Sequence, residues 1–266
     1  MNTIDSRNNF YFDIVKELIP REDSSILICG GSFLDKQIFQ KLKFSNVTIT
    51  NVDEKKKTAE FLPYTWEFQN AQKLTYKDNS FDYVVIHAAI HHCSMPHNTL
   101  IELFRVAKKG VLAFESRDSF VMKVLERLNL TTTYEHGAVF YSGCKYGGVN
   151  NTEIPNYVYR WTEREIEKTI NTYSPYYDHK FIYRYGTAFP VMAAHEKKAN
   201  LKMLFLKIML PFYKIFIFFF KKQQNQFAFY IEKPSSKSTL KPWLMIDDKN
   251  NISFNRQWAE KIYKTN

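Results

Sequence analysis

The sequence predicts an α/β fold: a Rossmann-like, mostly parallel sheet flanked by helices. Two observations lead to this prediction. Between residues 25 and 116, short apolar runs rich in β-branched and aromatic residues alternate with amphipathic stretches. The hydrophobic content of 45% and the charged content of 24% suit a chain of 266 residues that buries a core. Strands that alternate with helices pack as a parallel sheet with helices on both faces.

The elements of this pattern follow one another along the chain. Buried strands are predicted at 24–29, 47–52, 65–69, 81–87 and 110–116. Helices are predicted at 33–43, 96–109 and 118–129. Thr162 and Glu165 have the spacing of a capping box, so a further helix begins there and ends before Pro175. The last predicted strands are 180–186 and 227–233, which would pair with each other.

Charge and cysteine content exclude several classes of protein. The net charge is +10, but residues 196–245 hold ten lysines and two glutamates, so this segment alone contributes +8. The basic character is therefore local, and it is not a footprint for nucleic acid over the whole fold. The three cysteines are far apart, which excludes a disulfide framework and favours a reducing compartment. The first residues do not resemble a signal peptide, so we expect a cytoplasmic protein.

Residues 201–222 are very apolar but are interrupted by lysines. No stretch within them reaches the roughly 18 apolar residues that span a bilayer. Lys207, Lys214 and Lys221 recur every seven residues and would form one polar stripe, while Pro211 predicts a kink or two short helices. We expect this segment to pack on the domain or on another subunit, which leaves a homodimer open. Peripheral contact with a membrane surface is the alternative.

Two short motifs indicate a nucleotide-like ligand. Gly30, Gly31 and Ser32 lie where the first strand ends and a helix begins, which lets a ligand approach the backbone and offers it free N–H groups. Asp53 ends the next strand, and its carboxylate could accept hydrogen bonds from both hydroxyls of a ribose. Capping of the following helix is the other interpretation of Asp53.

A third and a fourth motif make the pattern specific. Asn70 and Ala71 follow the strand at 65–69, where a side-chain amide and a backbone N–H can bind an adenine edge. The run NAQKLTYKDNSFDYVV resembles the sequence before the fourth strand in class I S-adenosylmethionine-dependent methyltransferases of the type 11 kind. The resemblance spans residues 25–116. It departs from the family at Phe33 and Leu34, which replace small residues of the glycine motif.

The resemblance implies a cofactor and a site. The family has a seven-stranded sheet whose last strand is antiparallel, and its cofactor is S-adenosyl-L-methionine. By resemblance, Gly30 and Gly31 would approach the methionine part of the cofactor, with Ser32 as a further cofactor-binding residue. Asp53 would bind the ribose, and Asn70 and Ala71 would hold the adenine. His87, at the end of the fourth strand, would face the cofactor and the substrate.

Candidate catalytic residues cluster after the fourth strand. Four of the seven histidines lie in HAAIHHCSMPH, at 87, 91, 92 and 97. His92 matches a histidine that is frequent in the family and is our preferred general base, with His91 and Glu135 as further candidates. A zinc site made of His87, His91 and Cys93 is the alternative, but the break between strand and loop disfavours its geometry, so we expect no metal.

The sequence after the fifth predicted strand divides into further segments. We assign residues 1–116 to a cofactor-binding core, 117–180 to an inserted cap, 181–233 to the closing strands with a helical insert at about 196–222, and 234–266 to an extension. Five residues of the cap are expected to bind substrate, with Arg160 as a phosphate clamp: Tyr134, His136, Tyr141, Arg160 and Trp161. Ordinary packing is the other interpretation of these side chains.

Residues 134–161 resemble the insert of methyltransferases of bacterial surface-polysaccharide synthesis. We therefore expect methyl transfer to an oxygen of a small acceptor, which would be a sugar or a phosphate or phosphoramidate group. A nucleotide-linked or phosphorylated acceptor fits this expectation. An RNA methyltransferase is the runner-up, but the motif of amino-group methylation is missing and nucleic acid is not the expected partner. A non-catalytic membrane-surface or assembly protein with a degenerate cofactor fold is the third hypothesis.

Overall fold

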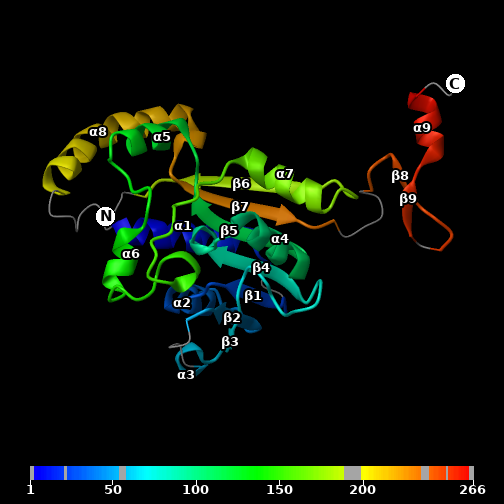
Figure 1. The fold of residues 1–266 in the computed structure, drawn as a ribbon, viewed down its shortest axis with the longest axis horizontal. Helices are drawn as coiled ribbons and strands as arrows, with labels where there is room; N and C mark the ends of the chain where they lie inside the picture. Colours follow the sequence, from blue (N-terminus) through cyan, green and yellow to red (C-terminus); the bar gives the residue numbers. More distant parts are fainter. Residues whose placement is uncertain are drawn as a thin grey trace.

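The computed structural model describes residues 3–20, 23–53, 58–188, 199–234, 240–249 and 251–263. Its centre is a seven-stranded sheet in the order β3-β2-β1-β4-β5-β7-β6 (Figure 1). The strands are β1 (Ile26–Cys29), β2 (Val47–Asn51), β3 (Thr65–Phe68), β4 (Phe81–His87), β5 (Ala107–Ser116), β6 (Lys180–Gly186) and β7 (Gln226–Glu232). A separate hairpin joins β8 (Leu244–Ile246) to β9 (Ile252–Phe254).

The helices surround this sheet. They are α1 (Thr3–Leu18), α2 (Phe33–Lys41), α3 (Thr58–Phe61), α4 (Pro96–Val106), α5 (Phe120–Arg127), α6 (His136–Tyr141), α7 (Glu163–Tyr173), α8 (Ala199–Phe219) and α9 (Arg256–Ile262). Short 3-10 turns are η1 (Ile90–His92), η2 (Val149–Asn151) and η4 (Lys221–Gln223).

The pairing of the strands confirms the predicted fold class. β1, β2, β3, β4 and β5 are parallel, whereas β7 is antiparallel to both β5 and β6. The predicted pair at 180–186 and 227–233 is therefore present as β6 and β7. The sheet reverses its order after β1, between β1 and β4, and the carboxyl ends of such strands are where open α/β sheets bind ligands.

Each face of the sheet has its own apolar core. Successive residues of a strand point to opposite faces, so Leu27 and Ile28 of β1 belong to different clusters. Ile28 packs with α1 and α2, through side chains such as Tyr11 and Phe39. Leu27 packs with α4 and α7, through side chains that include Leu103. The sequence pattern did not predict α1, although its Tyr11 and Val15 are completely buried.

Some details differ from the prediction and one is confirmed. The helix predicted at 96–109 ends at Val106, and β5 already begins at Ala107, because Ala107 pairs with β4 and Gly110 pairs with β4 and β7. The capping box is confirmed: Glu165 accepts hydrogen bonds from the backbone N–H and hydroxyl of Thr162. Pro211 lies inside α8, so the prediction of two short helices is wrong, and the helix bends along its length (Figure 1).

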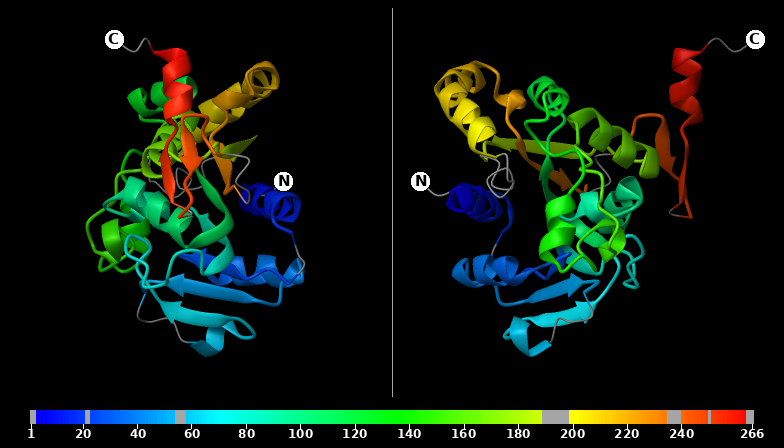
Figure 2. Two further views of the ribbon diagram at one scale, coloured as in Figure 1. Left: turned by 90° about the vertical axis from the view of Figure 1, so that its right-hand side faces the viewer. Right: turned by 60° about the vertical axis from the view of Figure 1, so that its left-hand side comes forward.

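α8 is apolar but does not qualify as a membrane span. Within the described residues, no helix is both long enough and apolar enough to cross a bilayer. The predicted stripe of lysines is shorter than expected, because Lys207 and Lys214 lie in α8 but Lys221 lies beyond it in η4. Figure 2 shows α8 and α5 at the same end of the molecule.

Candidate functional site

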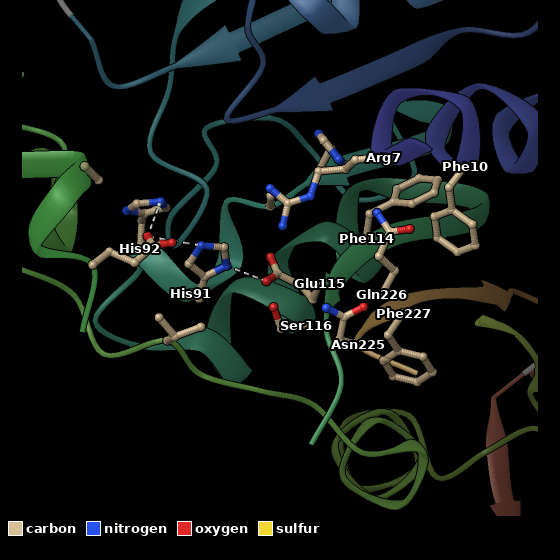
Figure 3. A pocket seen from close by; sticks show the side chains of 15 residues that line it. Arg7, Phe10, His91, His92, Phe114, Glu115, Ser116, Asn225, Gln226 and Phe227 are labelled. Atoms are coloured by element: carbon tan, nitrogen blue, oxygen red, sulfur yellow. Dashed lines mark hydrogen bonds and ion pairs between the residues drawn. The ribbon is translucent and has the colours of Figure 1, made fainter. Parts of the chain in front are cut away.

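Two cavities lie next to each other at the carboxyl ends of the parallel strands. The histidine cavity has a volume of about 240 Å³ and is lined by residues of α1, β4, β5 and the start of β7, together with Glu135 and Ala138 (Figure 3). The glycine cavity has a volume of about 270 Å³ and is lined by the ends of β1, β2 and β3 and by the loop at 147–151. Residues from the segment 117–180 thus border both cavities.

The two glycines after β1 have different roles. Gly30 lines the glycine cavity in a left-handed conformation, with φ of 64°, and a Cβ there would lie 2.6 Å from the Cβ of Ala89. Gly31 does not line the cavity. A Cβ at Gly31 would lie 2.5 Å from Cγ2 of Ile49, so Gly31 is needed for the packing of β1 against β2. Only Gly30 therefore fits the predicted approach of a ligand to the backbone.

Ser32 and Asp53, which were also predicted to bind the cofactor, do not line the glycine cavity. Ser32 donates from its backbone N–H and hydroxyl to Asp35, at 2.7 Å each, and so caps α2 rather than lining a cavity. Asp53 follows Val52, which lines the glycine cavity, but is not itself among the lining residues. Its backbone N–H donates to Asn51 Oδ1, at 3.1 Å. Its role as a ribose ligand stays a prediction.

Asn70 and Ala71 both line the glycine cavity, as predicted for residues that bind an adenine. Asn70 Oδ1 accepts from the backbone N–H of Gln72 at 2.9 Å, so the amide group is held in one orientation.

The loop at 147–151 closes the glycine cavity from the opposite side. Asn150 Oδ1 accepts from Gln72 Nε2 at 2.9 Å and from the backbone N–H of Ser94 at 3.0 Å. Side-chain hydrogen bonds thus hold a wall that is 56 to 78 residues away in sequence from its partners.

A single short segment separates the two cavities. Ala88 and His92 line both of them. Ala88 has a left-handed backbone, with φ of 50°, at the end of β4, and this conformation turns the chain away from the strand into η1. The ring of His92 is therefore placed where the two cavities meet.

Two carboxylates, Glu115 and Glu135, lie against the histidines of η1 (Figure 3). His91 Nδ1 lies 2.5 Å from Oε2 of Glu115, and His91 Nε2 lies 3.5 Å from Oε2 of Glu135. His92 Nε2 lies 3.3 Å from the same Glu135 oxygen. Glu115 also accepts from the backbone N–H groups of Ala89 and Ile90, which fixes it under η1. The sequence prediction had brought His91, His92 and Glu135 together, but it missed Glu115.

The two histidines differ in protonation. Burial alone would lower the pKa of His91, but the carboxylates of Glu115 and Glu135 outweigh it and raise the pKa to about 10. Burial, followed by the charge of His91, lowers the pKa of His92. Burial would raise the pKa of Glu135, yet its contacts with His91 and His92 lower it to about 2. At neutral pH, His91 is therefore an imidazolium, Glu135 a carboxylate and His92 a neutral base.

The same cluster has donors of the kind that bind metals. One ligand atom from each of His91, His92 and Glu135 lies within 4.8 Å of the others, a spacing that could hold a divalent ion. It is not the predicted alternative of His87, His91 and Cys93, because the ring of His87 stacks on Tyr11 instead, with ring centroids 4.3 Å apart. The expectation that the site holds no metal stays a prediction.

His87 and Arg7 lie on the other side of the histidine cavity. His87 was predicted to face the cofactor, but it lines only the histidine cavity. Burial lowers its pKa, so it is neutral. Arg7, which the sequence analysis missed, reaches from α1 toward η1 (Figure 3). Among the described side chains it has no ion-pair partner, so a cationic group is available to a ligand in this cavity.

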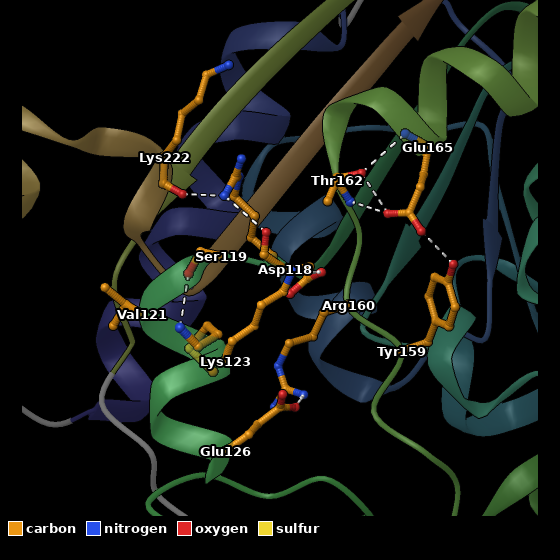
Figure 4. A network of polar contacts seen from close by, with 12 residues as sticks. Asp118, Ser119, Val121, Lys123, Glu126, Tyr159, Arg160, Thr162, Glu165 and Lys222 are labelled. Carbon is orange, nitrogen blue, oxygen red and sulfur yellow. Dashed lines mark hydrogen bonds and ion pairs between the residues drawn. The ribbon is translucent and has the colours of Figure 1, made fainter. Parts of the chain in front are cut away.

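The substrate-binding residues predicted in the cap need correction. Trp161 is completely buried in the apolar core. Arg160 is buried and forms an ion pair with Glu126 and a hydrogen bond to the carbonyl of Thr132, so it is not a free phosphate clamp (Figure 4). Tyr134, His136 and Tyr141 are exposed and line neither cavity. The cap residues that do line the histidine cavity are Glu135, Ala138 and Val158.

The missed residues share one property: they come from elements without a motif. Arg7 lies on the unpredicted α1, and Asn225 and Gln226 lie where β7 begins. The only available signal was for Glu115, which ends a predicted strand at the same edge of the sheet as His87. Parallel strands place their carboxyl ends together, so an acidic residue there could have been assigned to the site.

Comparison with known proteins agrees with this architecture. Residues 29–114 match the family model described as a methyltransferase domain. No curated protein matches the sequence.

Several solved structures share the fold at low sequence identity. Magnesium protoporphyrin IX methyltransferase from Synechocystis PCC 6803, solved with bound S-adenosylhomocysteine, has 12% identity and a TM-score of 0.50, over 87% of this chain and 84% of that one. A Thermotoga maritima protein described as a SAM-dependent methyltransferase, possible histamine N-methyltransferase, has 14% identity and a TM-score of 0.51, over 87% and 92%. The [4+2]-cyclase SpnF has 13% identity and a TM-score of 0.51, over 86% and 81%. These likenesses show the fold.

Proposed function

We propose that this chain, whose residues 29–114 match a methyltransferase-domain model, uses S-adenosylmethionine to methylate an oxygen of a small anionic acceptor. One observation carries the proposal: His92 and Ala88 line both the glycine cavity and the histidine cavity. A cofactor in the first cavity and an acceptor in the second would meet at the only residues that the two linings share. His92 would then touch the reacting oxygen.

The residues of the glycine cavity fit the cofactor. Gly30 leaves the backbone open to a ligand, the Asn70 amide lines the cavity and could bind an adenine edge, and Asp53 lies one residue beyond the lining. When bound, S-adenosylmethionine supplies a methyl group that its sulfonium already activates. The protein therefore has to position the acceptor oxygen and manage its proton.

His92 supplies the base in this proposal. A hydroxyl acceptor loses its proton as its oxygen bonds to the methyl carbon, and neutral His92 would take that proton. The positive charge then formed on His92 would lie 3.3 Å from the carboxylate of Glu135. The imidazolium of His91 contacts the same oxygen of Glu135 and keeps this carboxylate ionised, so His91 and Glu135 act by positioning and charge.

The histidine cavity favours an acceptor with negative charge. The guanidinium of Arg7 reaches into it, and the amides of Asn225 and Gln226 add neutral hydrogen-bonding groups. Arginine binds phosphate through paired hydrogen bonds. We infer a sugar phosphate, a nucleotide-linked sugar or a phosphoramidate as acceptor, of the kind used to modify surface polysaccharides. If the methylated atom is itself an anionic oxygen, Arg7 would neutralise its charge and no base would be needed.

Two measurements test this function. Titration calorimetry with S-adenosylhomocysteine should give micromolar binding that Asp53→Ala weakens. Transfer of labelled methyl groups should then be screened over matched pairs of sugars with and without a phosphate group. Transfer only to phosphate-bearing acceptors supports the proposal, and transfer only to neutral acceptors rejects the anionic class. Absence of S-adenosylhomocysteine binding, both alone and with acceptors present, would reject methyl transfer.

A further inference from the structure

α8 has one face that nothing in the described structure covers. With about 100° of rotation per residue, its half-buried side chains fall within an arc of about 60°; they are Leu206, Leu210, Tyr213 and Ile217. Its exposed large apolar side chains spread over about half of the circumference, on the opposite side. They are Leu201, Leu204, Phe205, Ile208, Met209, Phe212, Ile215, Phe216, Phe218 and Phe219. A solvated helix normally turns polar residues outward, so this face is built for an apolar environment.

The lysines of α8 mark the edge of this face. At the same angular step, Lys207 and Lys214 lie within about 20° of each other, between the packed stripe and the exposed apolar face. Both are exposed. Lys221 and Lys222 follow directly in η4, and residues 197–231 contain no aspartate or glutamate. Lys222 is paired with Glu163, with Nζ 3.4 Å from Oε1, so the positive charge along the flank of the apolar face comes from Lys207 and Lys214, which have no acidic residue on their own helix.

α5 extends the same surface. Phe120, Val124 and Leu128 are exposed and follow one another at intervals of four residues, which places them on one side of the helix. Figures 1 and 2 show α5 at the same end of the molecule as α8, and α5 contacts η4, the turn after α8. The backbone N–H of Val121 donates to Gln223 Oε1 of η4, at 3.2 Å, and fixes the start of α5 against the end of α8.

We propose that α8 and α5 bind the surface of an anionic phospholipid membrane. α8 would lie in the interface, with its apolar face in the acyl boundary and its lysines at the level of the lipid phosphates. The charge selects this occupant over a second copy of the chain, because a self-paired face would gather lysines without acidic partners. A crossing of the bilayer is excluded for the described helices.

Such binding would bring the histidine cavity close to the membrane. Arg117 follows Ser116 of the cavity wall and donates to the carbonyl of Lys222, directly after α8. Asn225 and Gln226, three and four residues beyond Lys222, line the same cavity. An acceptor carried on a lipid could therefore reach the cavity from the bound surface. Membrane binding and methyl transfer are separable, because no residue of α8 lines either cavity.

Vesicle flotation of the full chain tests this proposal. Vesicles of phosphatidylcholine with phosphatidylglycerol should carry the protein to the top of the gradient, and vesicles of phosphatidylcholine alone should carry much less. Lys207→Glu with Lys214→Glu should weaken binding about 30-fold or more, since each lysine near an anionic surface contributes roughly a factor of five to ten. Lys73→Glu with Lys77→Glu has the same charge change in an exposed loop after β3 and should leave flotation unchanged.

A second variant tests the apolar face. Phe212→Gln with Ile215→Gln should abolish flotation while S-adenosylhomocysteine affinity and the circular dichroism spectrum stay as in the native chain. If the Lys207→Glu/Lys214→Glu variant floats as well as the Lys73→Glu/Lys77→Glu variant, the lysines of α8 do not contribute to membrane binding and the proposal of an anionic membrane is overturned. Absence of native binding to anionic vesicles, with elution of the chain as a dimer that Phe212→Gln dissociates, would assign the face to a second copy and overturn the proposal.

Discussion

The glycine cavity and the histidine cavity share a wall but are built by different means. The glycine cavity uses strand ends, glycine and amide side chains, and among the described residues that line it, only His92 and Cys93 are ionisable. The histidine cavity gathers Arg7, His87, His91, His92, Glu115 and Glu135, which all titrate or carry charge. A cavity made from backbone and strand ends suits a ligand common to many proteins. Under the proposed function, a cavity made from charged side chains on different elements would set the specificity for the acceptor.

The largest effect is expected for His92, which lines both cavities. His92→Ala should lower kcat by about 10² to 10⁴ when the acceptor is a hydroxyl, the usual contribution of a general base. The S-adenosylhomocysteine affinity should change far less, because the ring contributes only one of the residues that line the glycine cavity. Because the pKa of His92 lies below its ordinary value of 6.5, the native rate should be flat at pH 7 to 8 and fall in acid.

Steady-state kinetics over pH 5 to 9 would check this prediction. His92→Gln, which keeps a polar group but accepts no proton, is the matched control. An unchanged kcat in both variants would show that the acceptor oxygen is already anionic or that another group takes the proton.

A second substitution should affect the glycine cavity alone. Gly30→Val forces a β-branched residue into a left-handed backbone and against Ala89, so cofactor binding should weaken about ten- to a hundredfold. Gly31→Ala is the control, because its new Cβ would press on Ile49 outside the cavity. It should lower the melting temperature without changing the S-adenosylhomocysteine affinity. Calorimetry and thermal unfolding separate the two outcomes, and equal losses of affinity would refute the distinction between the glycines.

The charged cluster of the histidine cavity should appear in the pH dependence of stability. The pKa of His91 is raised to about 10 in the folded chain, so its contribution is complete below its ordinary pKa and is lost as the pH rises toward 10. The pKa of Glu135 is lowered to about 2, so its contribution is lost as the pH falls from its ordinary value toward 2. The pair therefore stabilises the fold most between these limits, near pH 5 to 6.

His91→Gln should reduce the free energy of unfolding by about 2 kcal/mol near pH 5.5, and this difference should shrink as the pH approaches 10. Urea unfolding at several pH values would measure it. A difference that is constant with pH would mean that His91 acts through packing and not through charge.

The smallest effect is expected for Arg7, and it tests whether this residue binds the acceptor or the cofactor. Arg7→Gln should raise KM for a phosphate-bearing acceptor about tenfold, the order of one charged hydrogen bond at a partly solvated site, and should leave S-adenosylhomocysteine binding unchanged. Arg7→Lys keeps the charge without the paired geometry and should fall between the two. If S-adenosylhomocysteine affinity falls instead, Arg7 binds the carboxylate of the cofactor and the acceptor needs another anion site.

The same contrast explains how far the sequence could predict the molecule. The sheet from β1 to β5 was predictable because each strand is a short apolar run and because Gly30 and Asn70 follow strands directly. The pairing of β6 with β7 was predictable for the same reason. The glycine cavity is therefore largely visible in local sequence, apart from the loop at 147–151, whose place depends on hydrogen bonds from Asn150 to distant partners.

The histidine cavity was only partly predictable, because its residues come together through tertiary packing. Arg7 lies on a helix that starts without an apolar run, and no local signal ties it to η1. Arg160 and Trp161 were predicted to bind substrate because charged side chains are usually exposed and this one stands next to a large aromatic residue. Their neighbours decide otherwise, since Glu126 pairs with Arg160 and the core encloses Trp161. Arg117 and Trp161 also form an isolated parallel β-bridge, and a pairing between residues so far apart in the chain cannot be predicted from one sequence.

The loop at 147–151 has a kinetic consequence. Its hold on the rest of the molecule at Gln72 and Ser94 consists of a few side-chain hydrogen bonds, each worth about 0.5 to 1.5 kcal/mol. It also has Gly147 and the left-handed Asn150 and Asn151 in its backbone. These few bonds can open locally while the sheet stays intact. Under the proposed function, spent cofactor would then leave on this side of the glycine cavity without displacing the methylated acceptor from the neighbouring cavity.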